Sequence, residues 1–303
     1  MPASSWAGAL ALLALAPALP GLALKTRAWL TGRTGSPVLQ PYRELAKLLR
    51  RGRIESRGGG WPLAYAPAAS AAAAAAALCF VPVAGRAAMV AFPGDLIVFA
   101  GLLALGRFFQ ALGSLDTGSS FQGMGASREL AVSIFGEPAL LLSFLVLVLA
   151  TRQLSLSGIF AARLQASWAA APAALVMAAV ALFIVMLAEA GRGPVDDPTT
   201  HLELTMIHEV MVLEYGGPDL ALVLASVALR FALFAALLAG LVTPRLGLAA
   251  RFVPIAFAGF LVLIPVAVGT LETLFARLRL SRVPLLLISA SIVSLLGCLL
   301  VLR

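Results

Sequence analysis

Residues 131–150, AVSIFGEPALLLSFLVLVLA, form an apolar run in which Glu137 is the only charged side chain. A helix of about 20 apolar residues is long enough to cross the hydrocarbon core of a bilayer. Seven more such runs occur in the chain of 303 residues, at about 6–24, 62–84, 95–113, 169–189, 219–241, 252–275 and 284–302. Only short loops separate them. The sequence therefore predicts an all-α polytopic membrane protein with about eight transmembrane helices, in which residues 1–303 form a single transmembrane domain.

The composition points to the same fold class. Hydrophobic residues make up 61% of the chain and charged residues only 12%, whereas soluble globular proteins contain about 25% charged residues. Both cysteines, Cys79 and Cys298, fall in apolar runs without ligand-like neighbours, so neither a disulfide nor a cluster site is predicted.

The basic residues are unevenly distributed between the two sides of the predicted bundle. The first, third, fifth and seventh loops carry fourteen Lys and Arg residues, and the opposite side carries six. Basic residues mark cytoplasmic loops, so the first loop (25–61) and the acidic loop (190–218) are predicted to be cytoplasmic, with both termini outside. The net charge of +8 thus indicates topology, and nucleic acid is not an expected partner.

The first loop contains PYRELAKLLRR, residues 41–51, which predicts an amphipathic surface helix. Placed at helical spacing, Arg43, Lys47 and Arg50 fall on one face and the leucines on another. Two interpretations of this basic face remain open. It is attracted to lipid head groups only, or it docks a cytoplasmic partner.

Charged groups at or near membrane depth are costly, so each is a candidate for function. The candidates are Glu129, Glu137, Glu189, Arg192, Asp196, Glu203, Glu209 and Glu214. A partly desolvated carboxylate has its pKa raised, whereas a nearby arginine lowers it, so such groups can load and release protons. The alternative is a set of salt bridges that fixes the helices and the loop.

The segment HLELTMIHEVMVLEY, residues 201–215, contains both histidines of the chain. It is predicted to be helical, and on one continuous helix His201 and His208 share a face while Glu203 and Glu214 lie near the opposite face. The motif His-Glu-x-x-His is absent and no three of these groups converge, so no metal site is predicted.

The longer stretch AEAGRGPVDDPTTHLELTMIHEVMVLEYGG, residues 188–217, resembles the signature of the subunit 1 family of respiratory complex I. Its departures from the complex I form are similar to the branch of membrane-bound nickel–iron (NiFe) hydrogenases: formate hydrogenlyase subunit 4, hydrogenase 4 component C and the corresponding membrane component of energy-converting hydrogenase. Residues 39–50, 105–129 and 271–284 agree with this branch, so the resemblance covers nearly the whole chain.

The resemblance implies a non-catalytic anchor subunit of an oxidoreductase complex in a bacterial or archaeal cytoplasmic membrane. Its carboxylates would couple a soluble arm to antiporter-like subunits and move protons or sodium ions. The chain itself would carry no cofactor, because the iron–sulfur clusters and the NiFe centre belong to hydrogenase-like large and small subunits and an Fe–S subunit. The expected soluble-arm interface comprises Arg43, Lys47, Arg50, Asp116, Arg128, His201 and His208.

Three alternatives remain at this stage. The chain could be the quinone-site subunit of a complex I-like enzyme, or a stand-alone secondary ion transporter. It could also belong to a hydrogenase-related complex whose large subunit has lost its nickel ligands.

Overall fold

The apolar runs form the long helices of the structure, a computed structural model that describes residues 3–53, 58–161, 163–196 and 206–303. Prolines lie in the first turn of most of these helices, where the missing N–H of proline breaks no helical hydrogen bond. Pro62, Pro172, Pro218, Pro254 and Pro284 hold such positions. The positions of these prolines in the sequence therefore indicate where the helices begin.

The described residues contain twelve α-helices, four short 3₁₀ helices and no strand. The α-helices are α1 (Ala3–Leu15), α2 (Ala18–Leu30), α3 (Gln40–Leu49), α4 (Trp61–Leu78), α5 (Asp95–Asp116), α6 (Ser120–Thr151), α7 (Leu156–Ile159), α8 (Arg163–Ala170), α9 (Pro172–Glu189), α10 (Gly217–Val242), α11 (Val253–Leu274) and α12 (Val283–Leu302). The 3₁₀ helices are η1 (Val210–Val212), η2 (Thr243–Leu246), η3 (Ala250–Phe252) and η4 (Leu280–Arg282). The predicted polytopic all-α membrane fold is confirmed.

The number of spans differs slightly from the predicted eight. Within the described ranges, six helices are long and apolar enough to cross a membrane, and the pair α1 and α2, bent by 42°, would make a seventh. The bend falls at Ala16-Pro17, inside the predicted first span. The remaining predicted span is α4, an alanine-rich helix that is not among these six. It packs against α5 and α10 as a member of the bundle.

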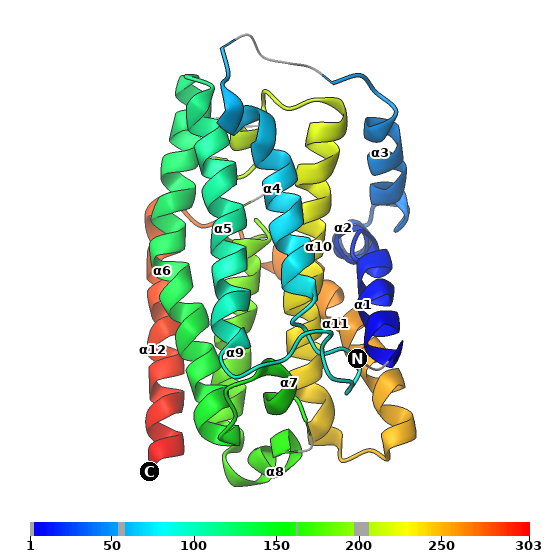
Figure 1. Ribbon diagram of the computed structural model, residues 1–303, viewed down its shortest axis with the longest axis vertical. Coiled ribbons are helices and arrows are strands. Elements are labelled where there is room, and N and C mark those ends of the chain that lie inside the picture. The colour runs from blue at the N-terminus through cyan, green and yellow to red at the C-terminus, as the bar shows by residue number, and fades with distance from the viewer. Residues whose placement is uncertain (1–2, 54–57, 162, 197–205) are drawn as a thin grey trace.

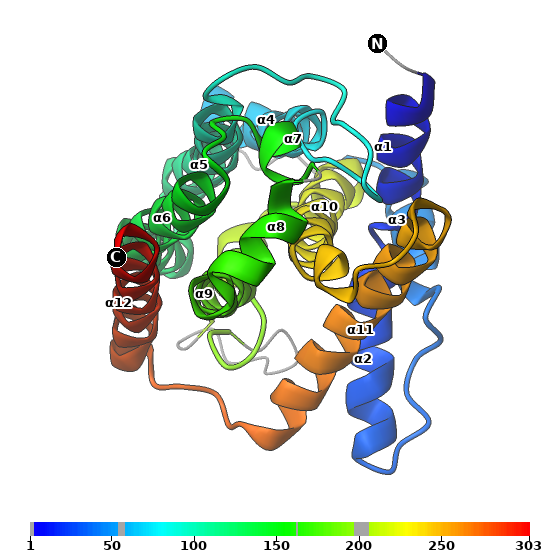
Figure 2. The ribbon, with the colours of Figure 1, turned by 90° about the horizontal axis from the view of Figure 1, so that it is seen from below.

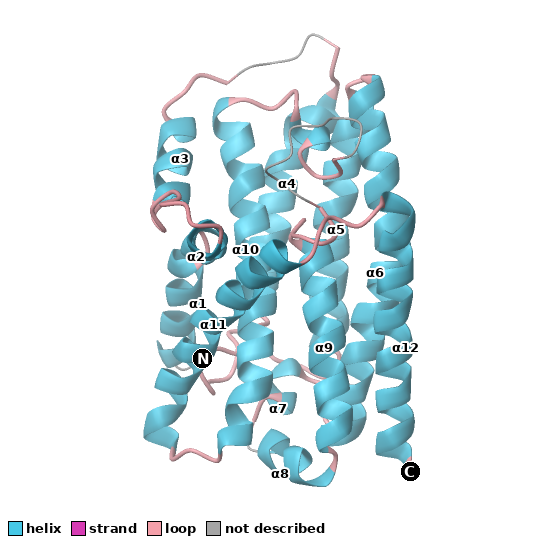
Figure 3. Ribbon diagram, turned by 180° about the vertical axis from the view of Figure 1, so that it is seen from behind, coloured by secondary structure: helices cyan, strands magenta, loops and turns pink. Residues whose placement is uncertain are grey.

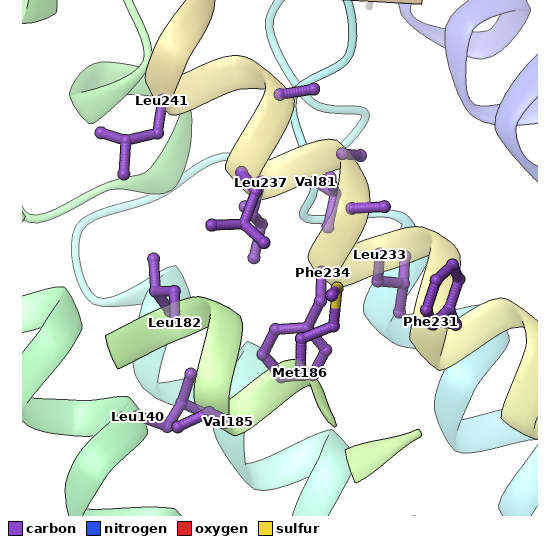
Figure 4. Packing of buried hydrophobic residues seen from close by; sticks show 14 of the residues in the cluster. Val81, Leu140, Leu182, Val185, Met186, Phe231, Leu233, Phe234, Leu237 and Leu241 are labelled. Carbon is purple, nitrogen blue, oxygen red and sulfur yellow. The ribbon is translucent and has the colours of Figure 1, made fainter. Parts of the chain in front are cut away.

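Helices α9 and α10 occupy the interior of the bundle. Seen from below, they lie between α4, α5, α6 and α12 on one side and α1, α2 and α11 on the other (Figure 2). Leu182 and Met186 of α9 lie toward Leu237 and Phe234 of α10 in the core, and Val185 lies beside Leu140 of α6 (Figure 4). The interior helix α10 is more deeply buried than the outer helices α11 and α12. Of its apolar stretch 72% is buried, against 28% in each of the other two.

Loops one, three and five meet at one end of the bundle, drawn at the top of Figure 1. Asp116, at the end of α5, accepts hydrogen bonds from the amides of Gly60 (2.5 Å) and Leu63 (3.2 Å) at the start of α4. The backbone of Gly217 packs closely against the carbonyl of Gly52. The predicted grouping of these loops on one side of the membrane agrees with these contacts.

The predicted amphipathic helix is present as α3, and none of its residues is buried. It runs roughly along the long axis of the bundle beside α10 (Figures 1 and 3). The Tyr42 hydroxyl donates a hydrogen bond to the carbonyl of Ala14, and Leu45 lines a cavity between α3 and the bundle. The apolar face of α3 therefore packs toward the protein, and Arg43, Lys47 and Arg50 are exposed.

The prediction of a helical acidic loop is wrong for residues 206–216, the part of its second half that the structure describes. Between residues 206 and 216 the only regular element is the 3₁₀ turn η1. The amides of Ile207 and His208 donate to the side chain of Asp196, so they are not used in helical hydrogen bonds. The apolar side chains of this segment are buried against α5 and α6. We call residues 206–216 the docked loop.

Candidate functional site

Three ionisable side chains from three helices meet inside the bundle, and we call Arg107, Glu137 and Glu189 the membrane cluster. Arg107 of α5 donates to Glu137 of α6 at 2.8 Å and makes a second ion pair with Glu189 at the end of α9. The side chains of Arg107 and Glu189 are only 7% and 3% exposed, whereas that of Glu137 is 48% exposed. One guanidinium thus joins a buried carboxylate to one that reaches the outside of the helix bundle.

A second group, the loop cluster, consists of Glu129, Asp196, His208 and Arg277. The His208 imidazole lies between two carboxylates, with Nε2 3.4 Å from Glu129 Oε2 and Nδ1 3.5 Å from Asp196 Oδ2. The other oxygen of Asp196 pairs with Arg277 Nη2 at 2.9 Å. Charges from α6, the segment after α9, the docked loop and the segment after α11 therefore converge at one place.

The backbone around the loop cluster explains why His208 sits there. Asp196 Oδ2 accepts hydrogen bonds from the amides of Ile207 and His208, both at 3.1 Å, and Arg128 donates to the carbonyl of Met206 at 2.9 Å. Gly191 has a φ of +56°, and a Cβ at this position would lie 2.7 Å from His208 Nδ1. Glycine is needed at position 191 both for its backbone conformation and for the space that the imidazole fills.

The contacts of the loop cluster move the pKa values of His208 and Asp196 in opposite directions. Burial alone lowers the pKa of His208, but the charges of Glu129 and Asp196 more than reverse this effect, so the pKa is raised. Burial alone raises the pKa of Asp196, and the hydrogen bonds and charge of His208, with Arg277, more than reverse it, so this pKa is lowered. The pair therefore favours a protonated imidazole between carboxylates.

A third group surrounds Glu272 near the end of α11. Its side chain is 2% exposed and lies 3.7 Å from Arg192 and 4.0 Å from Arg27, measured between the charged atoms. Arg192 follows α9 and Arg27 belongs to α2. This group ties the bent first span to the segment that carries Asp196.

Two cavities connect these groups. A small cavity of about 10 Å³ lies between Arg107, Glu129 and Glu189 and is about the size that one water molecule needs. A larger cavity of about 510 Å³ lies between α2, α3, α10 and the docked loop, and its lining includes Arg192, Asp196 and His208. Ionisable groups therefore follow one another from the larger cavity through the loop cluster to the membrane cluster.

Glu137 interrupts an apolar face of α6. Leu130, Ile134 and Leu141 lie at helical spacing with it and are 42%, 66% and 44% exposed. A carboxylate at membrane depth on such a face is costly in contact with lipid alone. The face is suited to a neighbour that also offers a polar group.

The remaining predicted site residues are dispersed. Glu209 lines the larger cavity, Glu214 is exposed, and Asp116 caps α4. His201 and Glu203 lie outside the described residues. Across the part of the chain that the structure describes, no three His, Cys, Asp or Glu side chains are grouped as metal ligands.

Four charged residues of the site were missing from the predicted set: Arg27, Arg107, Glu272 and Arg277. Arg107 lies inside an apolar run, which is a signal that the sequence does contain. Glu272 falls at a predicted span end, and only the packing of α11 against α2 shows that it lies beside Arg27 and Arg192. Arg27 and Arg277 fall in basic loops, and only the structure shows that Arg277 pairs with Asp196.

Comparisons with known proteins agree with this architecture. Residues 5–302 match the family described as NADH dehydrogenase. Hydrogenase-4 component C of Escherichia coli strain K12 is 34% identical over 238 residues, which cover 78% of this chain and 74% of that protein. Formate hydrogenlyase subunit 4 of the same organism is 39% identical over 138 residues, 46% of this chain and 45% of that protein.

A solved structure shares the fold. A chain of the membrane-bound sulfane sulfur reductase, an archaeal respiratory membrane complex, superposes with a TM-score of 0.81 over 98% of this chain and 99% of that one, at 19% identity. The chain therefore belongs to the NADH dehydrogenase family, the family of complex I subunit 1, and is a membrane subunit related to those of hydrogenase complexes.

Proposed function

We propose that the chain is the anchor and ion-coupling subunit of a proton- or sodium-translocating, membrane-bound NiFe hydrogenase or formate hydrogenlyase-type complex. It links a soluble electron-transfer arm to antiporter-like membrane subunits. The names of the two E. coli relatives, a hydrogenase component and a formate hydrogenlyase subunit, support membership of such an assembly over a stand-alone transporter. The iron–sulfur clusters and the NiFe centre are assigned to the partners, and the chain works in the cytoplasmic membrane with both termini outside.

The observation that carries this proposal is the succession of ionisable groups from the docked loop to the outer face of α6. His208 contacts Glu129, and the small cavity separates Glu129 from the pair of Arg107 and Glu189. Arg107 then reaches Glu137 on the apolar face of the bundle. A charge change in the soluble arm, felt at the docked loop, can in this way alter protonation at a face suited to a neighbouring membrane subunit.

The soluble arm is placed at the end of the bundle where the loops meet. The exposed Arg43, Lys47 and Arg50 of α3 offer it a basic surface. The docked loop lies at the same end, with Arg128 holding the carbonyl of Met206. His208 is 13% exposed, so it would sense the arm through Asp196 and Glu129 more than by direct contact.

The test replaces Glu137 or Glu189 with glutamine in the complete complex. Arg107 keeps one carboxylate partner in each variant, so both complexes are expected to assemble and to pass electrons to an artificial acceptor. Ion pumping into sealed vesicles is expected to fall in both. Asp219→Asn at the start of α10 is the control and should pump normally, because Asp219 pairs with Arg53 near the surface and lies outside the three charged groups and both cavities. Normal pumping by both assembled variants would overturn the proposal.

The larger cavity supports a second candidate function, that of a quinone-site subunit. Its lining is mostly apolar and includes Pro17, Leu24, Leu45 and Phe231, with His208 at its polar side. Apolar pockets of this size with a few polar groups are typical of small-molecule sites. A photoreactive quinone analogue that labels these residues, competitively with unlabelled quinone, would favour this candidate over the first.

A further inference from the structure

Arg230 is a buried charge that neither the membrane cluster nor the loop cluster uses. It lies in the middle of α10 and is 2% exposed. Its Nη2 lies 3.1 Å from Ser70 Oγ, 3.0 Å from Gln110 Oε1 and 3.4 Å from Ser226 Oγ. All three partners are neutral, and no described carboxylate forms an ion pair with this guanidinium.

A role as a simple strut does not account for this arrangement. A charge buried without a counterion costs several kcal/mol, and more at membrane depth than at a surface. Ser70 of α4 and Ser226 of α10 already approach each other at 3.2 Å between their hydroxyl oxygens. The two helices are thus joined at this point without the guanidinium, and an apolar side chain would fill the site at lower cost.

Arg230 lies one hydrogen bond away from the larger cavity. Gln110, which accepts its hydrogen bond, also lines the larger cavity together with Asp196 and His208. The hydrogen bond to Gln110 therefore places the guanidinium one side chain away from the cavity into which His208 and Asp196 face. The charged groups around His208 are Glu129 from α6, Asp196 and Arg192 from the segment after α9, Arg277 from the segment after α11, Glu209 beside it and Arg230 from α10.

We propose that Arg230 is a positioning residue for proton release at His208, acting as a fixed positive charge that offsets Glu129 and Asp196. Two carboxylates alone would hold the proton on the imidazole, and the nearby cation makes that proton easier to give up. The direction of the effect follows from charge alone, because a buried cation beside the cavity disfavours a second positive charge on the imidazole and so lowers the pKa of His208, while the two carboxylates raise it. This inference rests on the proposed coupling function and adds to it the group that adjusts the donor.

The test follows the titration of His208 directly in the full chain held in lipid nanodiscs. The chain has only two histidines, so His201→Gln with ¹⁵N-histidine labelling leaves a single imidazole signal. Arg230→Gln should raise the midpoint of that titration by about 0.5 to 1 pH unit, the order of magnitude expected when one unit charge beyond contact distance is removed at an effective dielectric constant of about 20. Arg230→Lys keeps the charge and should leave the midpoint within about 0.3 units of the parent.

Ser226→Ala is the matched control, since it removes a hydrogen bond from the same guanidinium and keeps the charge. It should leave the midpoint unchanged. An unchanged midpoint in Arg230→Gln, or an equal shift in Ser226→Ala, would overturn the inference. Arg230→Met provides a second neutral variant. If both neutral variants fail to fold while Ser226→Ala folds, Arg230 is a structural residue and the inference is likewise overturned.

The readout also separates this inference from the proposed function. The His208 midpoint is measured without turnover. A shift of this midpoint in Arg230→Gln would therefore be observed even if the glutamine variants of Glu137 and Glu189 pump normally. In the complete complex, Arg230→Gln should move the pH optimum of coupled turnover to higher pH by the same interval. A fall in rate without a shift of the optimum would point to a structural defect.

Discussion

The ion pair between Arg107 and Glu189 is expected to show strong energetic coupling, because both side chains are buried inside the bundle. The design uses the Glu137→Gln background, so that the guanidinium has this one carboxylate partner. Arg107→Met then leaves Glu189, whose side chain is 3% exposed, as an unpaired buried carboxylate. Breaking a buried pair in this way costs about 3–5 kcal/mol, and Glu189→Gln should cost a similar amount.

Removing both charges should restore most of the stability. Replacing a buried pair by uncharged side chains of similar volume is often close to neutral, so Arg107→Met with Glu189→Gln should lie within about 1 kcal/mol of the background. The cycle would then give a coupling energy of several kcal/mol. In the thermal unfolding of the detergent-solubilised chain, each single change should lower the midpoint by about 10 °C and the double change by far less.

A pair near the surface serves as the control for this cycle. Arg53 and Asp219 lie 2.7 Å apart, but their side chains are 43% and 14% exposed. The same treatment should give a coupling energy of about 1 kcal/mol or less. Additive losses at Arg107 and Glu189, or an equal coupling energy at both pairs, would refute the assignment of a desolvated pair at membrane depth.

Three further predictions concern the docked loop and the topology. The pKa of His208 is raised, so its charged contacts are fully present below the ordinary value of 6.5 and are lost as pH rises through the raised value. The pKa of Asp196 is lowered, so its charged contacts are lost as pH falls through the lowered value. Amide exchange in the docked loop, corrected for the intrinsic rate, should therefore be slowest at a pH between these two pKa values. Gly125→Leu should speed this exchange about tenfold or more, because even a Cβ there lies 3.0 Å from Met211 Cγ, and Gly123→Leu, where nothing lies within 4 Å, should not. A reporter fused after Arg282 should be cytoplasmic and one at Arg303 outside, and a cytoplasmic C-terminus would contradict the predicted topology.

The helices could be predicted from the sequence because span length depends on local hydrophobicity alone. All eight apolar runs form helices, and the first is bent where Ala16-Pro17 interrupts it. The docked loop could not be predicted in the same way. Its apolar residues recur at helical spacing, but the Asp196 side chain takes the amide hydrogen bonds of Ile207 and His208. A local pattern cannot show a competitor that comes from another segment.

The candidate site could be predicted residue by residue but not pair by pair. Glu129, Glu137 and Glu189 were identified from the cost of charge at membrane depth. Their partners depend on which helices are neighbours, since Arg107 lies 82 positions before Glu189 in the sequence. Glu272 was missed for the same reason, because its contacts with Arg27 and Arg192 form only when α11 packs against α2.

The half-exposed Glu137 also bears on how such a subunit is made and kept in a cell. A newly inserted copy presents a carboxylate to the acyl chains until another protein covers that side of α6, so the orphan copy is less stable in the bilayer than the assembled one. Membrane proteases remove polypeptides that remain in such a state. The same side chain would therefore limit the lifetime of excess copies and keep the amount of this subunit in step with that of its neighbours.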